Sequence, residues 1–113
     1  MKILVTGGRD FNNKALLFDT LNKLHAESPI TLLIHGGSRG ADSLASEWAK
    51  EHGVAENGEK PNWKLGRGAG LIRNKEMLAQ NPDLVVAFPG GPGTADMVRK
   101  AQAAGRKVLK IAG

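Results

Sequence analysis

The residues from Pro89 to Thr94, Pro-Gly-Gly-Pro-Gly-Thr, have the composition of a phosphate-binding turn. Glycine has no Cβ, so the backbone N–H groups at Gly90, Gly91 and Gly93 can approach a ligand closely. We expect Thr94 to cap a helix that begins here, and a helix N-terminus carries partial positive charge that favours anions. The alternative is that the glycines serve only the steric needs of a strand-to-helix turn. The turn contains more glycine than such a connection requires, which favours the anion site.

A second glycine-rich turn, Thr6-Gly7-Gly8-Arg9-Asp10, follows the first apolar run of the chain. Gly7 and Gly8 offer the same open backbone, and we expect them to line the ligand site. Arg9 and Asp10 have two possible roles. They could hold the ligand, or they could pair with each other or cap the following helix.

A third turn, Gly36-Gly37-Ser38-Arg39-Gly40-Ala41-Asp42, follows another apolar run. We expect Gly36 and Gly37 to contribute backbone to the site, with Ser38 as a polar contact to phosphate or ribose. Asp42 is better explained as a cap of its own helix. His35 lies just before the turn, at the end of the expected strand. We interpret it as a histidine whose hydrogen bonds are satisfied within the protein rather than as a catalytic base.

Three further side chains could contact the ligand, and each has a structural alternative. Arg73 could bind an anion, or it could be a surface arginine that pairs with Glu76 at helical spacing. Asn74 would be a secondary polar contact beside it. Trp63 is an aromatic residue in a polar segment, where it could cover a base as a lid or pack against the edge of the sheet.

Several kinds of site are excluded or disfavoured by the residues present. The chain has no cysteine, its three histidines are scattered, and no metal-binding motif occurs, so we predict neither a metal nor a cofactor. Neither the dinucleotide fingerprint Gly-x-Gly-x-x-Gly in the first turn nor the P-loop motif is present. Nicotinamide-dependent hydride transfer and P-loop ATP hydrolysis are therefore not expected.

These turns must be positioned by strands that alternate with helices, which predicts an α/β fold. We expect a Rossmann-like three-layer α/β/α sandwich with a mainly parallel five-stranded sheet in the order 3-2-1-4-5, numbered along the chain. In this order the crevice lies at the carboxyl ends of the first and fourth strands. Residues 1–113 are predicted to form one nucleotide-binding domain. The expected strands are 2–5, 31–35, 84–88 and 108–111. We expect the segment near Val54, which lacks an apolar run, to be either a short edge strand or an open loop. The expected helices follow Asn12 or Asn13, include 44–49 and 71–78, and span 94–104.

Charge is distributed unevenly along the chain, which carries +5 overall. Residues 1–56 carry a net charge of −1 and residues 57–113 a net charge of +6. The second half therefore attracts anions, either a phosphorylated small molecule or nucleic acid. No apolar run approaches the length of a membrane span, so we expect no membrane partner and a cytoplasmic location.

The turn at 89–94 resembles the Pro-Gly-Gly-x-Gly-Thr motif of the SLOG superfamily of Rossmann-like proteins. That superfamily includes cytokinin-activating phosphoribohydrolases and the DNA-processing protein DprA. The stretches at 7–11, 36–42 with Trp48, and 72–78 are similar to the YspA-related branch. The resemblance implies a nucleotide or nucleotide-derived ligand and a possible homodimer.

The resemblance also bears on catalysis. It places Arg73 on an arginine that the phosphoribohydrolases use at the substrate, but their motif continues to a glutamate where this chain has Met97. The thioether of Met97 can neither activate water nor balance the positive charge that develops on the ribose. Asp96, one residue earlier, is a candidate substitute, but on a helix its side chain points in a different direction. We therefore expect the protein to bind a nucleotide or nucleotide-derived ligand as a sensor or carrier. The first alternative is that Arg73 and Asp96 catalyse hydrolysis of an N-glycosidic or phosphoribosyl bond. DprA-like nucleic-acid binding is the second alternative.

Overall fold

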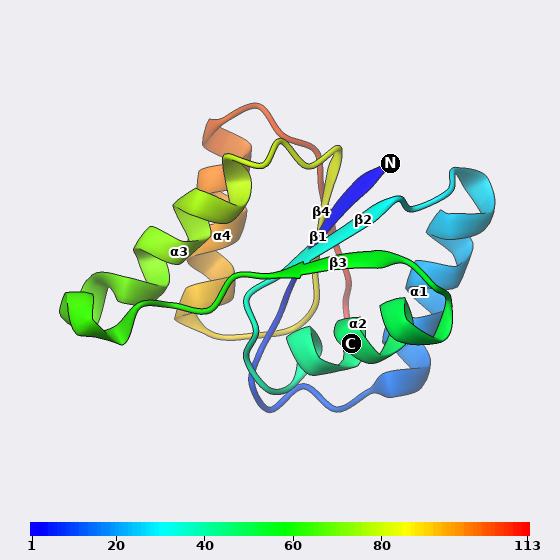
Figure 1. Ribbon diagram of the computed structural model, residues 1–113, viewed down its shortest axis with the longest axis horizontal. Coiled ribbons are helices and arrows are strands. Elements are labelled where there is room, and N and C mark those ends of the chain that lie inside the picture. Colours follow the sequence, from blue (N-terminus) through cyan, green and yellow to red (C-terminus); the bar gives the residue numbers. More distant parts are fainter.

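A computed structural model describes residues 1–113 and shows a single twisted sheet between two layers of helices (Figure 1). Each strand is followed by a helical segment until the last strand closes the sheet. The elements in chain order are β1 (Lys2–Thr6), α1 (Lys14–Glu27), β2 (Leu32–His35), α2 (Ala41–Glu51), β3 (Ala55–Gly58), the 3-10 segment η1 (Trp63–Gly68), α3 (Ala69–Leu78), β4 (Leu84–Ala87), α4 (Pro92–Ala103) and β5 (Val108–Lys110).

All five strands are parallel, in the order β3-β2-β1-β4-β5. The register pairs Leu4 of β1 with Ile34 of β2 on one side and Val85 of β4 on the other. These residues are completely buried, which explains why the central strands are continuous apolar runs. The predicted Rossmann-like α/β fold and its strand order are confirmed.

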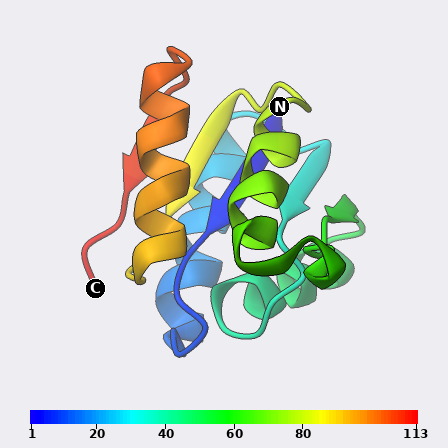
Figure 2. The same cartoon turned by 90° about the vertical axis from the view of Figure 1, so that its left-hand side faces the viewer.

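The two helix layers bury two separate apolar clusters, one on each face of the sheet. On one face α1 and α2 pack together and cover a cluster that includes Leu17, Leu21 and Trp48. On the other face α3 and α4 lie side by side over a smaller cluster that includes Met77 and Met97 (Figure 2). The crossovers that leave β1 and β4 therefore go to opposite faces, and this opens a crevice between their carboxyl ends.

Local signals set most element ends as expected. Asn13 caps α1, because its Oδ1 accepts from the backbone N–H of Leu16 at 3.1 Å. Gly53 and Gly105 follow α2 and α4 with φ of +62° and +72°, the left-handed conformation that ends helices. Of the two alternatives for the segment near Val54, the short edge strand is confirmed. It is β3, at the edge of the sheet, where a partly exposed strand needs no apolar run.

The predicted start of α4 is wrong by two residues. The helix begins at Pro92, with Gly91 at the N-cap position, and no side chain caps it. Thr94 therefore lies inside the first turn. Proline suits the first helical position, because its φ is already helical and no N–H is lost there.

No helix in the structure combines the length and apolarity that crossing a bilayer requires.

Candidate functional site

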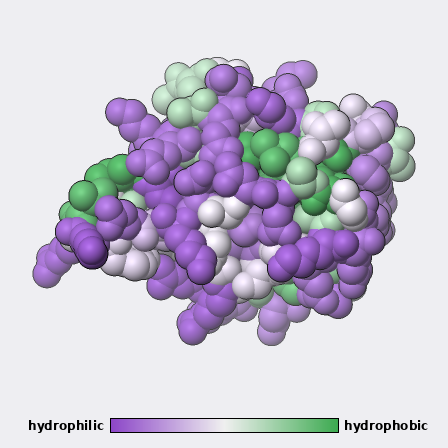
Figure 3. Space-filling view, in the orientation of Figure 1, coloured by the Kyte–Doolittle hydropathy of each residue, from purple (hydrophilic) through white to green (hydrophobic).

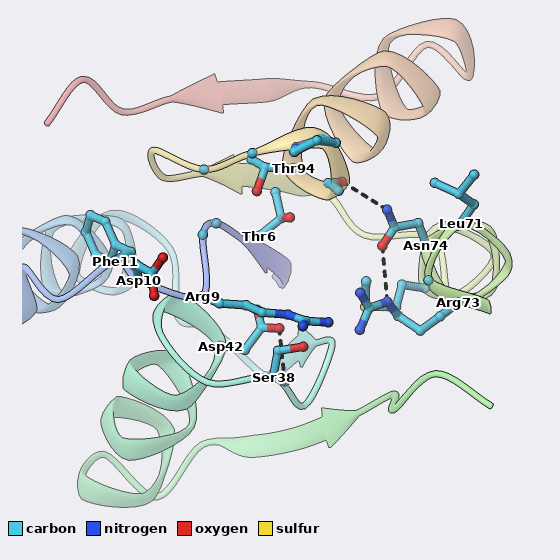
Figure 4. Close-up of a pocket in the computed structure, with 18 of the residues that line it drawn as sticks. Thr6, Arg9, Asp10, Phe11, Ser38, Asp42, Leu71, Arg73, Asn74 and Thr94 are labelled. Carbon is cyan, nitrogen blue, oxygen red and sulfur yellow. Dashed lines mark hydrogen bonds between the residues drawn. The ribbon is translucent and has the colours of Figure 1, made fainter. Parts of the chain in front are cut away.

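A cavity of about 710 Å³ opens at the carboxyl ends of β1 and β4, where a Rossmann-like fold binds ligands. Its wall comes from the turns after β1, β2 and β4, the start of α2, η1 and the first turns of α3. Figure 4 labels lining residues from these segments other than η1. The lining residues are Thr6, Gly7, Gly8, Arg9, Asp10, Phe11, Ser38, Asp42, Trp63, Arg67, Gly70, Leu71, Arg73, Asn74, Met77, Pro89, Gly90, Gly91, Pro92, Gly93 and Thr94.

Backbone hydrogen bonds hold the three glycine-rich turns against one another. The N–H of Gly8 donates to the carbonyl of Pro89 at 2.9 Å, and the N–H of Ala41 donates to the carbonyl of Gly8 at 3.2 Å. Gly40 has φ of +80°, and a Cβ there would meet the Gly8 carbonyl oxygen at 2.2 Å. The turns approach so closely that this position requires glycine.

Most of the residues expected from the sequence line this cavity. Gly36, Gly37 and Asp96 do not. The carbonyl of Gly36 instead accepts from Arg73 Nη1 at 2.7 Å, and the Gly37 N–H donates to His35 Nδ1 at 3.0 Å. The expected residues that line the cavity are Gly7, Gly8, Arg9, Ser38, Arg73, Asn74, Pro89, Gly90, Gly91, Gly93 and Thr94.

Arg73 extends from α3 into the cavity and is held by backbone and amide oxygens. Besides the bond to Gly36, its Nε donates to Asn74 Oδ1 at 3.2 Å. No ion pair joins it to Glu76, so the surface alternative does not apply. Desolvation and the nearby Arg9 lower the pKa of Arg73 from its usual value, against the opposing effect of Asp42. The guanidinium remains charged and partly desolvated.

Positive charge in the cavity is incompletely paired. Arg9, Arg67 and Arg73 all line it, and none of them forms a salt bridge. In Figure 4 Arg9 extends toward Arg73. The exposed Asp10 carboxylate pairs outward with Arg39 at 3.2 Å. An anion would complete the electrostatics of this site.

Asp42 is a carboxyl group buried in the wall of the cavity, with 7% exposure. Its Oδ2 accepts from the N–H of Ser38 at 3.3 Å, so it ties the preceding turn to the first turn of α2. It does not occupy the N-cap position, which belongs to Gly40. Desolvation raises the pKa of Asp42, although the Ser38 hydrogen bond and the charges of His35 and Arg73 act in the opposite direction.

Asp96 lies behind the cavity, between α3 and α4. Its Oδ2 accepts from Lys100 Nζ at 2.7 Å and from Asn74 Nδ2 at 3.0 Å, and its Oδ1 accepts from Arg99 at 3.2 Å. Asn74, which is 2% exposed, thus links Asp96 to Arg73. The structure shows Asp96 as a support for Asn74 and does not place it on the cavity.

Two other sequence expectations are resolved by the packing. Met97 is fully buried in the apolar cluster under α3 and α4. It follows Asp96 directly on α4, so the two side chains point in directions about 100° apart. His35 is the satisfied strand-end histidine that we expected, since its Nδ1 accepts from Gly37 and its Nε2 contacts Glu56 at 2.9 Å. No group of three or more His, Asp or Glu side chains has an arrangement that could hold a metal ion.

Apart from Trp63, which is one of the candidates, the site predicted from the sequence omits the wall formed by η1 and the start of α3. Arg67, Gly70 and Leu71 line the cavity there. A signal was present, because Gly66-Arg67-Gly68-Ala69-Gly70 is a glycine-rich segment before a helix, as in the other turns. Trp63 also stands at this wall, 61% exposed, with Arg9 Cζ 5.9 Å from its ring centroid. It therefore does not pack against the edge of the sheet.

Comparison with known proteins agrees with the fold and extends over nearly the whole chain. The model of the YspA, cpYpsA-related SLOG family matches residues 1–66. The Gene 61 protein of Mycobacterium phage D29 is 35% identical over 97% of this chain and 95% of its own length. The molybdenum cofactor carrier protein of Chlamydomonas reinhardtii superposes with a TM-score of 0.68 at 27% identity, covering 96% of this chain and 75% of its own. On the family match over residues 1–66, this chain belongs to the YspA, cpYpsA-related SLOG family.

Proposed function

We propose that the cavity binds a nucleotide or a nucleotide-derived phosphorylated ligand, and that the protein acts as a sensor or carrier of it. The observation that carries the proposal is the set of three arginines, Arg9, Arg67 and Arg73, which line a glycine-walled cavity without forming an ion pair. Arginine binds phosphate in two-pronged geometry and stays charged. A phosphate group would provide the missing counter-charge.

The turn at the start of α4 is the proposed phosphate position. The first N–H groups of a helix lack intrahelical partners, so Gly93 and Thr94 can donate to an anion while Gly90 and Gly91 admit it. The volume of about 710 Å³ lies within the range of small-molecule sites. The likeness to a cofactor carrier supports a role in which the ligand is held and released rather than converted.

Isothermal titration calorimetry with mononucleotides, cyclic nucleotides and ADP-ribose tests the proposal. We expect at least one of them to bind with a dissociation constant of about micromolar to millimolar. Arg9→Ala and Arg73→Ala should each weaken that binding by about tenfold or more, because each removes a hydrogen-bonding charge.

Arg106→Ala is the matched control, because Arg106 bonds to Asn81 and does not line the cavity. It should bind as the wild type does. The Arg9 side chain makes no hydrogen bond or salt bridge with the rest of the protein, so its variant separates a loss of binding from a loss of folding. No binding by any of these ligands at millimolar concentration would refute the proposal.

Hydrolysis of an N-glycosidic bond is a second candidate, favoured by one observation. The buried carboxyl of Asp42 and the guanidinium of Arg73 line the same cavity. In this version Asp42, rather than Asp96, would assist departure of the base. Release of free adenine from AMP that is abolished in Asp42→Asn, while AMP binding persists, would establish it. The absence of release from a protein that binds AMP would leave the carrier or sensor role.

A further inference from the structure

We propose that Trp63 is the platform on which the planar ring of the bound ligand stacks, while its phosphate lies at the turn before α4. The inference rests on the proposed function and specifies how the ligand lies in the cavity. Trp63 begins η1, and Figure 2 shows η1 (dark green, lower right) well to one side of the start of α4 (lower left). A ligand that reaches both must therefore be elongated, with an anionic end and an apolar planar end.

Trp63 is exposed to solvent at the wall of the cavity. Its side chain is 61% exposed, although it is one of the largest apolar groups in the chain, whereas Trp48 is fully buried. Leu71, which also lines the cavity, is 48% exposed. Two apolar side chains left open at the wall of a polar cavity provide a surface for an apolar part of the ligand.

The other aromatic residue of the cavity is already occupied. Phe11 packs against Phe88 with ring centroids 5.2 Å apart, and it contacts the apolar cluster under α1 and α2. Trp63 has no aromatic partner within the protein, and its ring contact is the guanidinium of Arg9. Of the two rings, Trp63 is therefore the one without an aromatic partner, and the ligand ring would stack on the face that Arg9 does not cover.

Arg9 links the two ends of the proposed ligand position. Its Cζ stands 5.9 Å from the Trp63 ring centroid, and its positive charge acts on Arg73. Figure 4 shows the Arg9 side chain extending into the centre of the site. A phosphate at the turn before α4, with the two arginines beside it, would therefore direct the attached ring toward Trp63.

The same end of the molecule offers a matched control. Leu65 and Ile72 are 55% and 42% exposed, and neither lines the cavity. Apolar atoms are visible at this end, over η1 and α3, on an otherwise largely polar face (Figure 3). Leu65→Ala reduces the apolar surface of this end without altering the cavity, so it separates stacking in the site from a general surface effect.

The experiment compares AMP with ribose 5-phosphate, which has the same phosphate and sugar but no ring system. Stacking of a base on an aromatic side chain predicts that the wild type binds AMP about 5- to 150-fold more tightly than ribose 5-phosphate. Trp63→Ala should abolish this advantage and leave the affinity for ribose 5-phosphate unchanged. Leu65→Ala should retain it in full, and Trp63→Phe should retain part of it.

Tryptophan fluorescence supplies an independent readout. Trp48 is fully buried, so the emission that AMP quenches should come from the exposed Trp63 and disappear in Trp63→Phe. Equal binding of AMP and ribose 5-phosphate by the wild type, or an advantage of AMP that survives Trp63→Ala, would overturn the stacking platform. Failure of both phosphates to bind, together with every other nucleotide of the calorimetric panel, would instead refute the proposed function itself.

Discussion

Asp96 is a buried charge whose role is to position another side chain. Burial by itself would raise the pKa of this carboxyl. Hydrogen bonds from Lys100 and Asn74, together with the charges of Lys100 and Arg99, outweigh burial and lower the pKa below its usual 3.8. Because Asn74 also holds Arg73, this network orients the guanidinium that faces the cavity. We therefore expect Asp96 to act through Asn74.

The lowered pKa predicts how stability depends on pH. A carboxyl that loses its proton more easily when folded stabilises the protein above its unfolded pKa and stops doing so as the pH falls through its folded pKa. Asp96→Asn should therefore lower the free energy of unfolding by about 1–3 kcal/mol near neutral pH. The difference from the wild type should shrink once the pH falls below the usual value of 3.8.

Urea denaturation of both proteins at a series of pH values measures this difference. Asp19→Asn is a suitable control, because Asp19 is an exposed partner of Lys23 on α1. Its effect should stay within about 0.5 kcal/mol at every pH. A loss for Asp96→Asn that persists unchanged at about pH 2, below the range in which carboxylates titrate, would contradict the charge network.

At the scale of elements, the turn between β4 and α4 combines glycines with different roles. A Cβ on Gly90 would lie 2.2 Å from Thr94 Oγ1 and 2.6 Å from the Gly8 backbone nitrogen, whereas a Cβ on Gly93 would meet nothing within 4 Å. The first position is closed by the packing of two turns. The second lies in the first turn of α4, open to the cavity.

This contrast predicts opposite effects of the same substitution. Gly90→Ala should lower the free energy of unfolding by about 1–3 kcal/mol, because the turns must move apart. Gly93→Ala should leave stability unchanged or raise it by up to about 1 kcal/mol, since alanine is the better helix former. Denaturant unfolding curves of the two variants provide the measurement. Equal destabilisation by both would show that the turn is not packed as described.

The elements also show what sequence could and could not predict. The buried strands, the glycine turns and the caps at Asn13, Gly53 and Gly105 follow from local signals, and with them most of the cavity wall. The position of Trp63 at the cavity wall does not follow from local signals, because η1 lies beside a segment without apolar periodicity. The burial of Asp96 depends on Asn74, which comes from a helix 22 residues earlier and meets it only after the chain has folded.

On the scale of the whole molecule, the strand order brings distant segments to one edge. Five parallel strands with right-handed crossovers allow few arrangements, which is why the order could be predicted. The same order explains the cavity, because β1 and β4 are neighbours and send their helices to opposite faces. Segments near residues 8, 38, 70 and 92 thereby surround one space although they span most of the chain.

The overall charge bears on the remaining alternative, nucleic-acid binding. Residues 57–113 carry a net charge of +6, but the structure divides this surplus among different places. Arg67 and Arg73 line the cavity, and Arg99 and Lys100 pair with Asp96. Nucleic-acid-binding proteins commonly present a stripe of basic residues along one surface. The net charge alone does not imply such a stripe.

Salt dependence distinguishes the two kinds of ligand. A mononucleotide brings about two negative charges into the cavity, so its affinity should fall by about tenfold or less between roughly 50 and 200 mM salt. A protein that holds DNA through six to ten phosphates would lose about 10³- to 10⁵-fold over the same range. We expect the first behaviour for AMP and only weak retention of a DNA duplex at the higher salt. A duplex that binds more tightly than AMP at about 200 mM salt would reverse this ranking, because the surplus charge would then act as one surface rather than as the lining of a cavity.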